Sequence, residues 1–306
     1  MTFRSLGEFV EALEQRGDLV RVQAPVSRDL EIAEVTRRTH AAGGPALLFE
    51  QVPGSAMPVV TNLLGHPRRI AVALGADRVE DVAERIAKLV RLRPPAGILG
   101  AFKDLGGTID LLQTVRALAP KRVRSGPVQE VEETTVDLDR LPILRCWPKD
   151  GDRTVTFPVV LTKDPETGEA HAGIYRLQQY GADTLGFHAQ VHRVGANNLR
   201  KWAARGERMP VAVVLGADPA TVFSGLAPVP EGISNLVFAG FLRGESVELV
   251  PARSVDLDGP RPRGDRPGRV RRPDRAEGRG TVRGPRRATT PPRNRSRSST
   301  SPGSRT

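Results

Sequence analysis

Arg176 is the residue with the clearest chemical capacity in this sequence. It lies in a strand-like run, Gly173–Tyr180, and its guanidinium could hold a carboxylate through two charge-assisted hydrogen bonds. Taken alone, a solvated arginine on a strand is the simpler interpretation. A carboxylate-binding role therefore needs support from the residues around it.

Histidines flank this run and could bind a metal ion through their imidazoles. His171 precedes Arg176, and His188 and His192 follow it. For His171 alone, a surface histidine at the edge of a hairpin explains the residue as well as a ligand does. Cys146, the only cysteine, has no evident base partner and is most simply a half-buried packing residue.

The elements before this region predict an α/β unit. Ser5 and Glu8 form a capping box for a first helix, and Gly17 is a plausible stop. Runs typical of strands and amphipathic helices then alternate: strands at Leu19–Val22, Ala46–Phe49 and Val59–Val60, helices at Leu30–His40 and Val79–Val90. Residues 93–130 read as a Gly/Pro-punctuated connection with one short helical stretch.

From Thr134 onward the pattern favours strands separated by turns. The apolar run Thr154–Thr162 leads into the turn Lys163–Gly168, and Gly173–Tyr180 reads as the returning strand. Further elements are predicted downstream: helices at Ala196–Arg205 and Asp218–Leu226, strands at Val211–Leu215 and Val247–Val250. We therefore expect a β-rich second domain with peripheral helices.

The positive charge is confined to the C-terminal segment. The formal net charge is +11, yet residues 259–306 hold 15 Arg against Asp265, Asp274 and Glu277, which leaves residues 1–258 near neutral. This segment has no Leu, Ile, Met, Phe, Tyr or Trp and cannot build a core, so we expect a disordered Arg/Pro/Gly tail. The three predicted regions are 1–105, 106–258 and 259–306.

The tail also has the composition of a GC-rich gene read out of frame. Codons can be chosen for Gly264–Asp274 so that reading from the second base gives Glu-Ile-Val-Leu-Glu-Gly-Tyr-Val-Asp-Pro-Thr, an ordinary strand and turn. The same phase applied to Arg279–Arg286 permits Glu-Gly-Pro-Phe-Gly-Asp-His. We expect a shifted frame here, with a natural basic tail as the alternative.

Several segments in order resemble the UbiD decarboxylase family. The likeness covers about residues 5–258 and is carried by short motifs: SLGEFVEALEQRGDLVRV at 5–22, WPKDG at 147–151, TFPVV at 156–160, HAGIYRLQ at 171–178, HAQVHRVG at 188–195, AVVLGADP at 212–219, PVPEG at 228–232 and FAGFLRG at 238–244. The family's catalytic segment resembles the second hidden phrase, Glu-Gly-Pro-Phe-Gly-Asp/Glu-His.

The resemblance implies an α/β fold: an N-terminal α/β domain, then a β-rich split-barrel domain that binds prenylated FMN. It implies reversible, non-oxidative decarboxylation of an aromatic or α,β-unsaturated acid, with the flavin as electron sink. A divalent metal, Mn²⁺ by preference, and K⁺ would accompany the cofactor phosphate. A flavin prenyltransferase would supply the cofactor, and the family forms homo-oligomers.

The resemblance also assigns roles to residues. Arg176 becomes the catalytic residue that orients the substrate carboxylate. The cofactor would contact eight residues: Ile174, Tyr175, Arg176, His188, Ala189, Gln190, Arg193 and Val194. The metal would fall to His171, His192 and Asn235, where the family has Asn, His and Glu, so the anionic ligand is replaced. A changed metal preference, weaker cofactor binding and a nonfunctional site are the alternatives.

The general acid is missing from the sequence as it stands. The carboxyl group that delivers the proton belongs to the hidden phrase. Glu231 lies in a Pro-rich loop where a solvated acid is the default, and Glu277 lacks the surrounding motif. We therefore expect the chain to be impaired or inactive.

Other function classes remain open at this point. A flavin-binding remnant without catalysis is the first alternative. Nucleic-acid binding through the arginines is the second, but the tail has no aromatic residue for base stacking. The N-terminus lacks a signal-like segment, and no run of about 18 apolar residues predicts a membrane span, so we expect a cytoplasmic protein.

Overall fold

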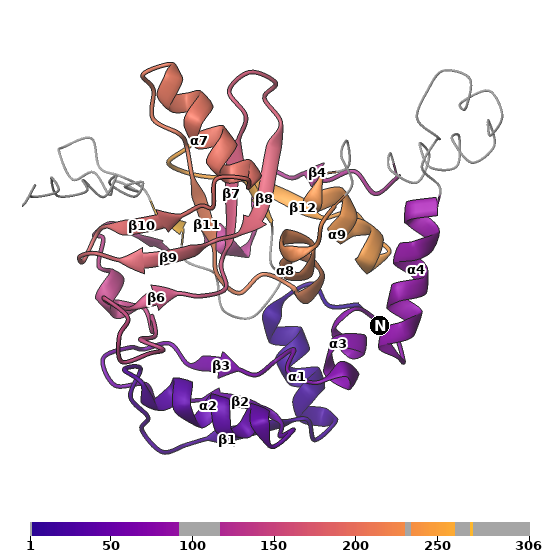
Figure 1. Cartoon of the computed structure of the whole chain (residues 1–306), viewed down its shortest axis with the longest axis vertical. Helices are drawn as coiled ribbons and strands as arrows, with labels where there is room; N and C mark the ends of the chain where they lie inside the picture. Colours follow the sequence, from indigo (N-terminus) through magenta and orange to yellow (C-terminus); the bar gives the residue numbers. More distant parts are fainter. Residues whose placement is uncertain (1, 92–116, 230–233, 261–269, 272–306) are drawn as a thin grey trace, which may run out of the picture.

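The computed structural model describes residues 2–91, 117–229, 234–260 and 270–271. An N-terminal α/β unit lies at one end of the molecule, and a β-rich unit with three helices lies above it (Figure 1). The predicted fold class, an α/β unit followed by a β-rich unit, is confirmed.

The N-terminal unit is a small mixed sheet with helices. Its sheet order is β1-β2-β3, with β1 parallel to β2 and β3 antiparallel to β2. The strands are β1 (Leu19–Val22), β2 (Ala46–Phe49) and β3 (Val59–Thr61). The helices are α1 (Leu6–Gln15), α2 (Glu31–Ala41), α3 (Pro67–Ala73) and α4 (Val79–Arg91). All but α3 match the sequence prediction.

Helix α1 begins and ends at the predicted residues. The Ser5 hydroxyl accepts a hydrogen bond from the Glu8 amide at 3.1 Å, which satisfies one of the free amides of the first turn. The Glu8 carboxylate reaches back to the amide of Arg4 instead of Ser5. Gly17 has φ +70°, a left-handed conformation that suits glycine after a helix. The apolar face of α1, with Phe9 and Leu13, is buried.

The described part of the β-rich unit contains several small, separate sheets. Their orders are β10-β9-β6, β11-β7-β8, β13-β12-β4 and β14-β5. The strands are β4 (Lys121–Arg122), β5 (Glu132–Glu133), β6 (Thr154–Val155), β7 (Val159–Lys163), β8 (Ala170–Ile174), β9 (Arg176–Gln179), β10 (Leu185–His188), β11 (Ala212–Val214), β12 (Glu248–Pro251), β13 (Asp258–Pro260) and β14 (Val270–Arg271). Two 3₁₀ turns, Pro127–Gln129 and Leu138–Arg140, precede β6.

The predicted strand Thr154–Thr162 is two strands in two sheets. β6 pairs with β9, whereas β7 pairs with β8 and β11. Pro158 lies just before β7 and has no amide hydrogen to donate to a ladder, so the chain changes sheets there. The apolar composition correctly predicted strands here, but it did not reveal the change from one sheet to the other at Pro158.

Three helices cover the β-rich unit: α7 (Val194–Ala204), α8 (Pro219–Leu226) and α9 (Asn235–Arg243). The first two were predicted, and the side chain of Asp218 caps α8 as expected. Helix α9 was not predicted. Its N-cap is Ser234 and it ends at Gly244, whose φ is +74°.

The two units share a hydrophobic core. Val82 of α4 packs in one buried cluster with Ala220 of α8 and with Phe238 and Leu242 of α9. Figure 1 shows α4 beside α9. The predicted boundary near residue 105 lies outside the described residues, and the units on either side of it are held together by this cluster.

At the C-terminal end, the folded part extends through Pro260. Residues 258–260 form β13 against β12, so the predicted start of the tail at residue 259 is two residues early. Residues 270–271 pair with β5. The rest of the predicted tail lies outside the described residues, and so do Glu231 and Glu277. Among the described residues, no helix has the length and apolarity to cross a membrane.

Candidate active site

The predicted cofactor residues meet where β8 gives way to β9. β8 ends at Ile174 and β9 begins at Arg176, and the two strands belong to different sheets. The predicted single strand Gly173–Tyr180 is thus broken at Tyr175. This side chain is only 3% exposed and packs with Leu177 and Phe187 in one buried cluster.

The Tyr175 hydroxyl joins two other elements at this junction. It accepts a hydrogen bond from the amide of Gly195 in α7 at 2.9 Å, and it lies 3.0 Å from Nε2 of His171 on β8. A Cβ at Gly173 or at Gly195 would lie within 2.8 Å of the Tyr175 ring. Both glycines are therefore required for the tyrosine to fit.

Arg193 ties the start of α7 to the end of β8. It is the N-cap residue of α7, and its Nη2 donates to the carbonyl oxygen of Ile174 at 3.2 Å. The guanidinium carbon lies 4.9 Å from the centre of the Tyr175 ring, within the range of a cation–π contact. A cation and the amides of a helix N-terminus thus lie together, which favours an anionic group nearby.

His171 is a neutral side chain in this structure. Burial and the Arg193 cation lower its pKa from 6.5 to about 4, against a hydrogen bond with Asn235 that raises it. Asn235 is the first residue of α9, and its Nδ2 donates to the Ser224 carbonyl of α8 at 2.6 Å. His171, Tyr175, Arg193 and Asn235 therefore form one connected group.

This lowered pKa makes stability pH-dependent. The unfolded chain binds a proton at His171 below about pH 6.5, whereas the folded chain binds it only near pH 4, so stability falls as the pH decreases across that window. The loss should be on the order of 1–3 kcal/mol. Urea unfolding at pH 7 and pH 4.5 should show that His171→Asn loses less stability between these two pH values than the wild type does. An equal loss in both proteins would contradict the assignment.

Arg176 and His188 form an exposed pair beside this buried group. They are cross-strand neighbours of β9 and β10 and both are exposed. Within the described part of the chain, no carboxylate pairs with Arg176. Its charge reaches Cys146, whose pKa is raised mainly by burial and by Asp150 and is lowered by Arg176. The Cys146 thiol is therefore protonated at neutral pH, which fits the prediction of a packing residue.

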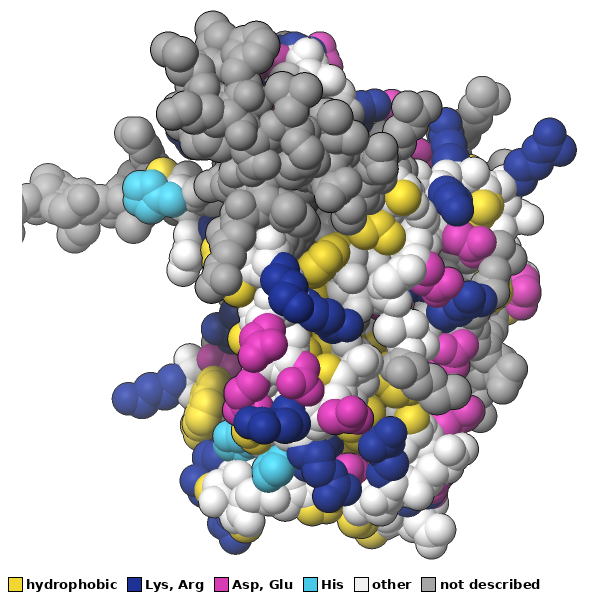
Figure 2. Space-filling view, turned by 90° about the vertical axis from the view of Figure 1, so that its right-hand side faces the viewer, with side chains coloured by type: hydrophobic (Ala, Val, Ile, Leu, Met, Phe, Trp, Pro, Cys, Tyr) yellow, Lys and Arg dark blue, Asp and Glu magenta, His cyan; other side chains and the backbone are white. Residues whose placement is uncertain are grey.

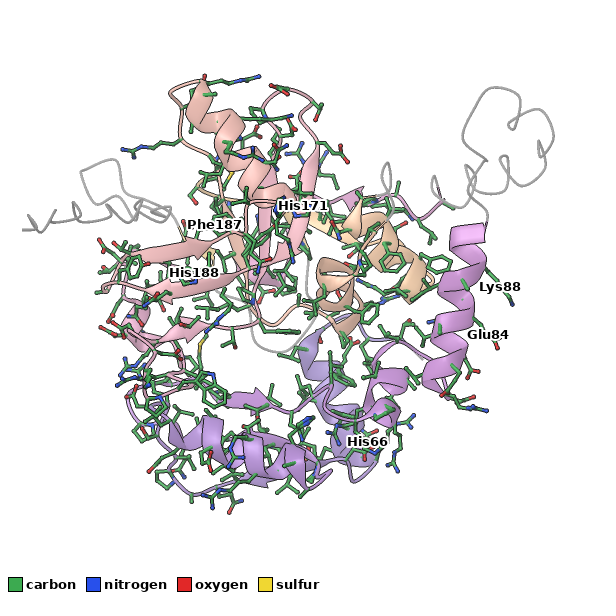
Figure 3. The ribbon with its side chains drawn as sticks, in the orientation of Figure 1. His66, Glu84, Lys88, His171, Phe187 and His188 are labelled. Atoms are coloured by element: carbon green, nitrogen blue, oxygen red, sulfur yellow. The ribbon has the colours of Figure 1, made fainter. Side chains whose placement is uncertain are left out.

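The remaining predicted residues follow β10 in one turn. Ala189 packs against the Tyr175 cluster, and the carbonyl oxygen of Gln190 accepts a hydrogen bond from the Arg193 amide at 2.9 Å. Val194 opens α7 and is 50% exposed. His192 is exposed. Figure 3 shows His171 and His188 in the same region, with His66 far away in the N-terminal unit.

Only two of the three predicted metal residues interact with each other. His171 and Asn235 interact, whereas His192 has no hydrogen bond or ion pair with either of them. Residues 2–91, 117–229, 234–260 and 270–271 contain no group of three or more His, Cys, Asp or Glu arranged to hold a metal ion. The metal set stays a prediction.

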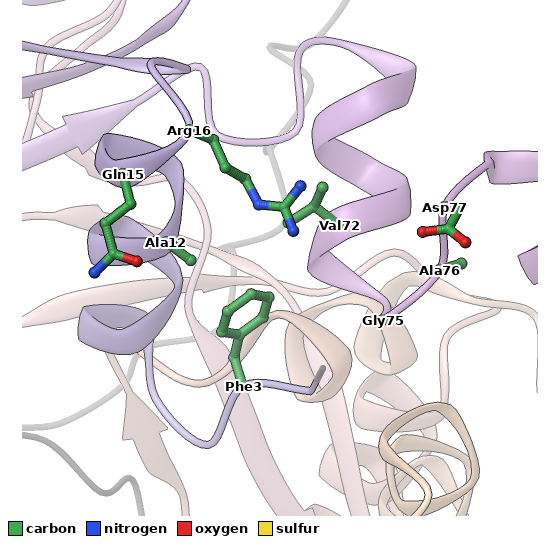
Figure 4. Close-up of a pocket in the computed structure, with 8 residues that line it drawn as sticks. All are labelled: Phe3, Ala12, Gln15, Arg16, Val72, Gly75, Ala76 and Asp77. Atoms are coloured by element: carbon green, nitrogen blue, oxygen red, sulfur yellow. The ribbon is translucent and has the colours of Figure 1, made fainter.

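Two hollows lie elsewhere. A cleft of about 1130 Å³ separates β3 from the segment 141–148, and Cys146, Trp147 and Phe157 line its far wall. A small pocket of about 170 Å³ beside α1 is lined by Phe3, Arg16 and Asp77 (Figure 4). None of the predicted cofactor or metal residues lines either hollow.

Sequence reasoning missed a buried ion pair behind the site. Asp218, which caps α8, lies 3.4 Å from Nη1 of Arg243 at the end of α9, and both side chains are at least 92% buried. Arg243 also binds Glu245, which holds Arg4 of the N-terminal unit. Arg243 lies in the motif FAGFLRG. The signal in the sequence was a charged residue that ends an otherwise apolar run.

Comparison with known proteins places the chain in a family. Residues 10–89 match the 3-octaprenyl-4-hydroxybenzoate carboxy-lyase N-terminal domain, and residues 121–261 match the Rift-related domain of the same carboxy-lyase. The chain belongs to the UbiD family. The expected resemblance is confirmed.

Individual relatives agree with this assignment. An uncharacterized protein of Archaeoglobus fulgidus is 44% identical over 258 residues, which are 84% of this chain and 52% of that protein. An evolved dimeric form of the UbiD-class enzyme HmfF from Pelotomaculum thermopropionicum, in complex with prFMN, is 29% identical with a TM-score of 0.70, covering 84% of this chain and 54% of that one.

The closed form of vanillic acid decarboxylase from Sedimentibacter hydroxybenzoicus is 26% identical with a TM-score of 0.71, over 84% of this chain and 52% of that one. The chain therefore spans about half the length of the relatives it matches.

Proposed function

We propose that this chain is the cofactor-binding half of a carboxy-lyase that decarboxylates an aromatic or α,β-unsaturated acid, reversibly and without oxidation, on prenylated FMN. The observation that carries the proposal is the exposed Arg176–His188 pair on β9 and β10, which directly follows Tyr175 and its contact with the Arg193 cation at the start of α7. The relatives support it, since one is a UbiD-class enzyme in complex with prFMN and another a vanillic acid decarboxylase.

The residues fit the flavin at two ends. Arg193, at the positive N-terminal end of α7, suits a phosphate through its guanidinium. Val194, the first residue of α7, is 50% exposed and would offer an apolar contact to the ring system. Ile174, Tyr175, Ala189 and Gln190 would frame the same ring system. When bound, prenylated FMN supplies the electron sink for loss of CO₂.

Arg176 would orient the substrate. An exposed guanidinium that has no carboxylate partner among the described residues is available to a ligand carboxylate, and its fork fixes the direction of the bond that breaks. The neighbouring His188 would border the flavin. No residue of this group supplies the replacing proton, and the proposal assigns that step to a carboxyl group encoded in the alternative frame of residues 279–286.

A turnover assay tests the proposal. The chain as it stands and a version continued in the alternative frame would each be loaded with prenylated FMN and offered a panel of aromatic and α,β-unsaturated acids. We expect CO₂ release from the continued version alone. Equal release by both would refute the impairment, and flavin binding without release by either would favour an inactive flavin-binding remnant.

Nucleic-acid binding is the weaker alternative. Acidic and basic side chains alternate over the face of the described part shown in Figure 2, and no broad basic patch appears on it. A phosphate-binding surface needs a concentration of positive charge. The other proposed partners are a flavin prenyltransferase, which would supply the cofactor, and further copies of the chain in a homo-oligomer. We keep the cytoplasm as the proposed compartment.

A further inference from the structure

His171 has hydrogen-bond partners on two sides. Nε2 lies 3.0 Å from the Tyr175 hydroxyl, and Asn235 is the second partner. The Asn235 bond raises the pKa of His171, so the imidazole donates and the Asn235 oxygen accepts, while the Asn235 amide nitrogen donates to the Ser224 carbonyl. An imidazole that donates to the Asn235 oxygen has one lone pair left, and that lone pair faces the Tyr175 hydroxyl.

The Tyr175 hydroxyl acts both as an acceptor and as a donor. Its oxygen accepts from the Gly195 amide at 2.9 Å, so its own proton is available for Nε2 of His171. A chain of donors and acceptors thus runs from α7 through Tyr175 and His171 to Asn235 and α8. A metal ion on His171 would have to displace one of these bonds, and it would leave a buried polar group without its partner.

The local charge also opposes a second cation. The Arg193 guanidinium lies 4.9 Å from the Tyr175 ring centre and bonds to Ile174 beside His171. Hard divalent cations take carboxylate oxygens, and the described residues around His171 offer an amide and a phenol instead. A divalent ion would therefore meet a guanidinium and no carboxylate among these described residues, so its only anionic partner would be the phosphate of the bound flavin.

We infer that His171 is not a metal ligand in this chain and that the His171–Tyr175–Gly195 bonds, together with Arg193, organise this end of the site in place of a divalent ion. This disagrees with the metal set predicted from the sequence. The inference rests on the proposed function only in the test that uses FMN. Binding of the metal alone can be measured on flavin-free protein.

The first test uses Mn²⁺ and the flavin-free full chain. An electron paramagnetic resonance titration should show no binding that depends on His171, so wild type and His171→Ala, which offers no ligand atom, should give the same curve. One Mn²⁺ per chain, bound by the wild type and at least tenfold weaker in the variant, would overturn the inference. Circular dichroism of both proteins checks the fold.

The second test uses the wild-type protein, and a variant is needed only to assign the His171 signals. Long-range proton–nitrogen correlation spectra of the imidazoles report the tautomer and any metal bond directly. We expect His171 to be neutral with Nδ1 protonated and unchanged by one equivalent of Zn²⁺. A large Zn²⁺-induced shift of its nitrogen signal would contradict the inference.

The third test adds FMN. Its affinity, measured by fluorescence quenching, should be the same within twofold with Mn²⁺ or with EDTA, and Tyr175→Phe should weaken it at least tenfold under both conditions. A tenfold loss caused by EDTA in the wild type would overturn the inference. Failure of FMN to bind at all would count against the proposed function, and the first two tests would still decide the metal question.

Discussion

Arg176→Ala is expected to lower kcat/KM for decarboxylation by about 10² to 10⁴-fold in the frame-continued chain loaded with prenylated FMN. The variant loses two charge-assisted hydrogen bonds to the substrate carboxylate, each on the order of 1.5–3 kcal/mol. Arg176→Lys keeps the charge without the planar fork, so its activity should lie between those of the alanine variant and the wild type.

Flavin content must be measured alongside, because Arg176 is also proposed to line the cofactor. We expect the flavin affinity to fall far less than the turnover per bound flavin. Arg200→Ala is the matched control, since Arg200 is an exposed arginine of α7 that bonds only to Asn197 among the described residues; its kcat/KM should stay within twofold. A turnover per flavin within threefold of wild type for Arg176→Ala would refute the carboxylate role.

Asp218→Ala should cause the largest loss of stability, on the order of 3–5 kcal/mol. Asp218 is 3% exposed, accepts the Thr221 amide at the start of α8 and faces Arg243. Removal of the carboxylate leaves a buried guanidinium with only Glu245 as a charged partner and opens the helix cap. Helix α8 packs against β8, and its Ser224 carbonyl accepts a hydrogen bond from Asn235 of α9. The damage should therefore reach the His171 group as well.

Urea unfolding separates the cap from the charge. Asp218→Asn keeps an acceptor for the Thr221 amide and should cost less than the alanine variant. Asp137→Ala removes an exposed cap of the turn Leu138–Arg140 and should cost about 1 kcal/mol. If Asp218→Ala were no more destabilising than Asp137→Ala, the buried pair would not hold α8 and α9 together.

Much of the fold follows from local patterns. Ser5, Gly17 and Asp218 mark helix ends through conformations and caps that depend on a few neighbouring residues, and the structure has them there. Helix α9 was missed because most of its residues, Asn235–Arg243, are apolar, and a short apolar run does not distinguish a buried helix from a buried strand. Such a helix is fixed by burial between α4 and α8, which sequence patterns do not reveal.

The sequence named candidate residues for the site but did not predict their geometry. Resemblance named Ile174, Tyr175 and Arg176 together, but an unbroken strand would have sent their side chains alternately to opposite faces of one sheet. That alternation is kept, with Tyr175 buried and Arg176 exposed, but the break at Tyr175 places Ile174 and Arg176 in two different sheets. That outcome depends on space at Gly173 and Gly195, residues on different elements.

The metal prediction shows the limit of residue type as a guide. His171 and Asn235 both belong to residue types that bind metals, and they do come together. Their hydrogen bonds to Tyr175 and Ser224, however, depend on how β8, α8 and α9 pack, although these partners are only 4 and 11 residues away in the sequence. Whether an imidazole has a free lone pair depends on those partners, so spacing alone could not settle it.

The most direct test of the central claim is the absorption spectrum of the full chain purified after co-expression with a flavin prenyltransferase. We expect a yellow protein that carries close to one prenylated flavin per chain, and a loss of most of that flavin in Arg193→Ala, which removes the cation at the start of α7. Colourless protein, whose melting temperature is also unchanged by added FMN, would contradict the assignment of this surface to a flavin.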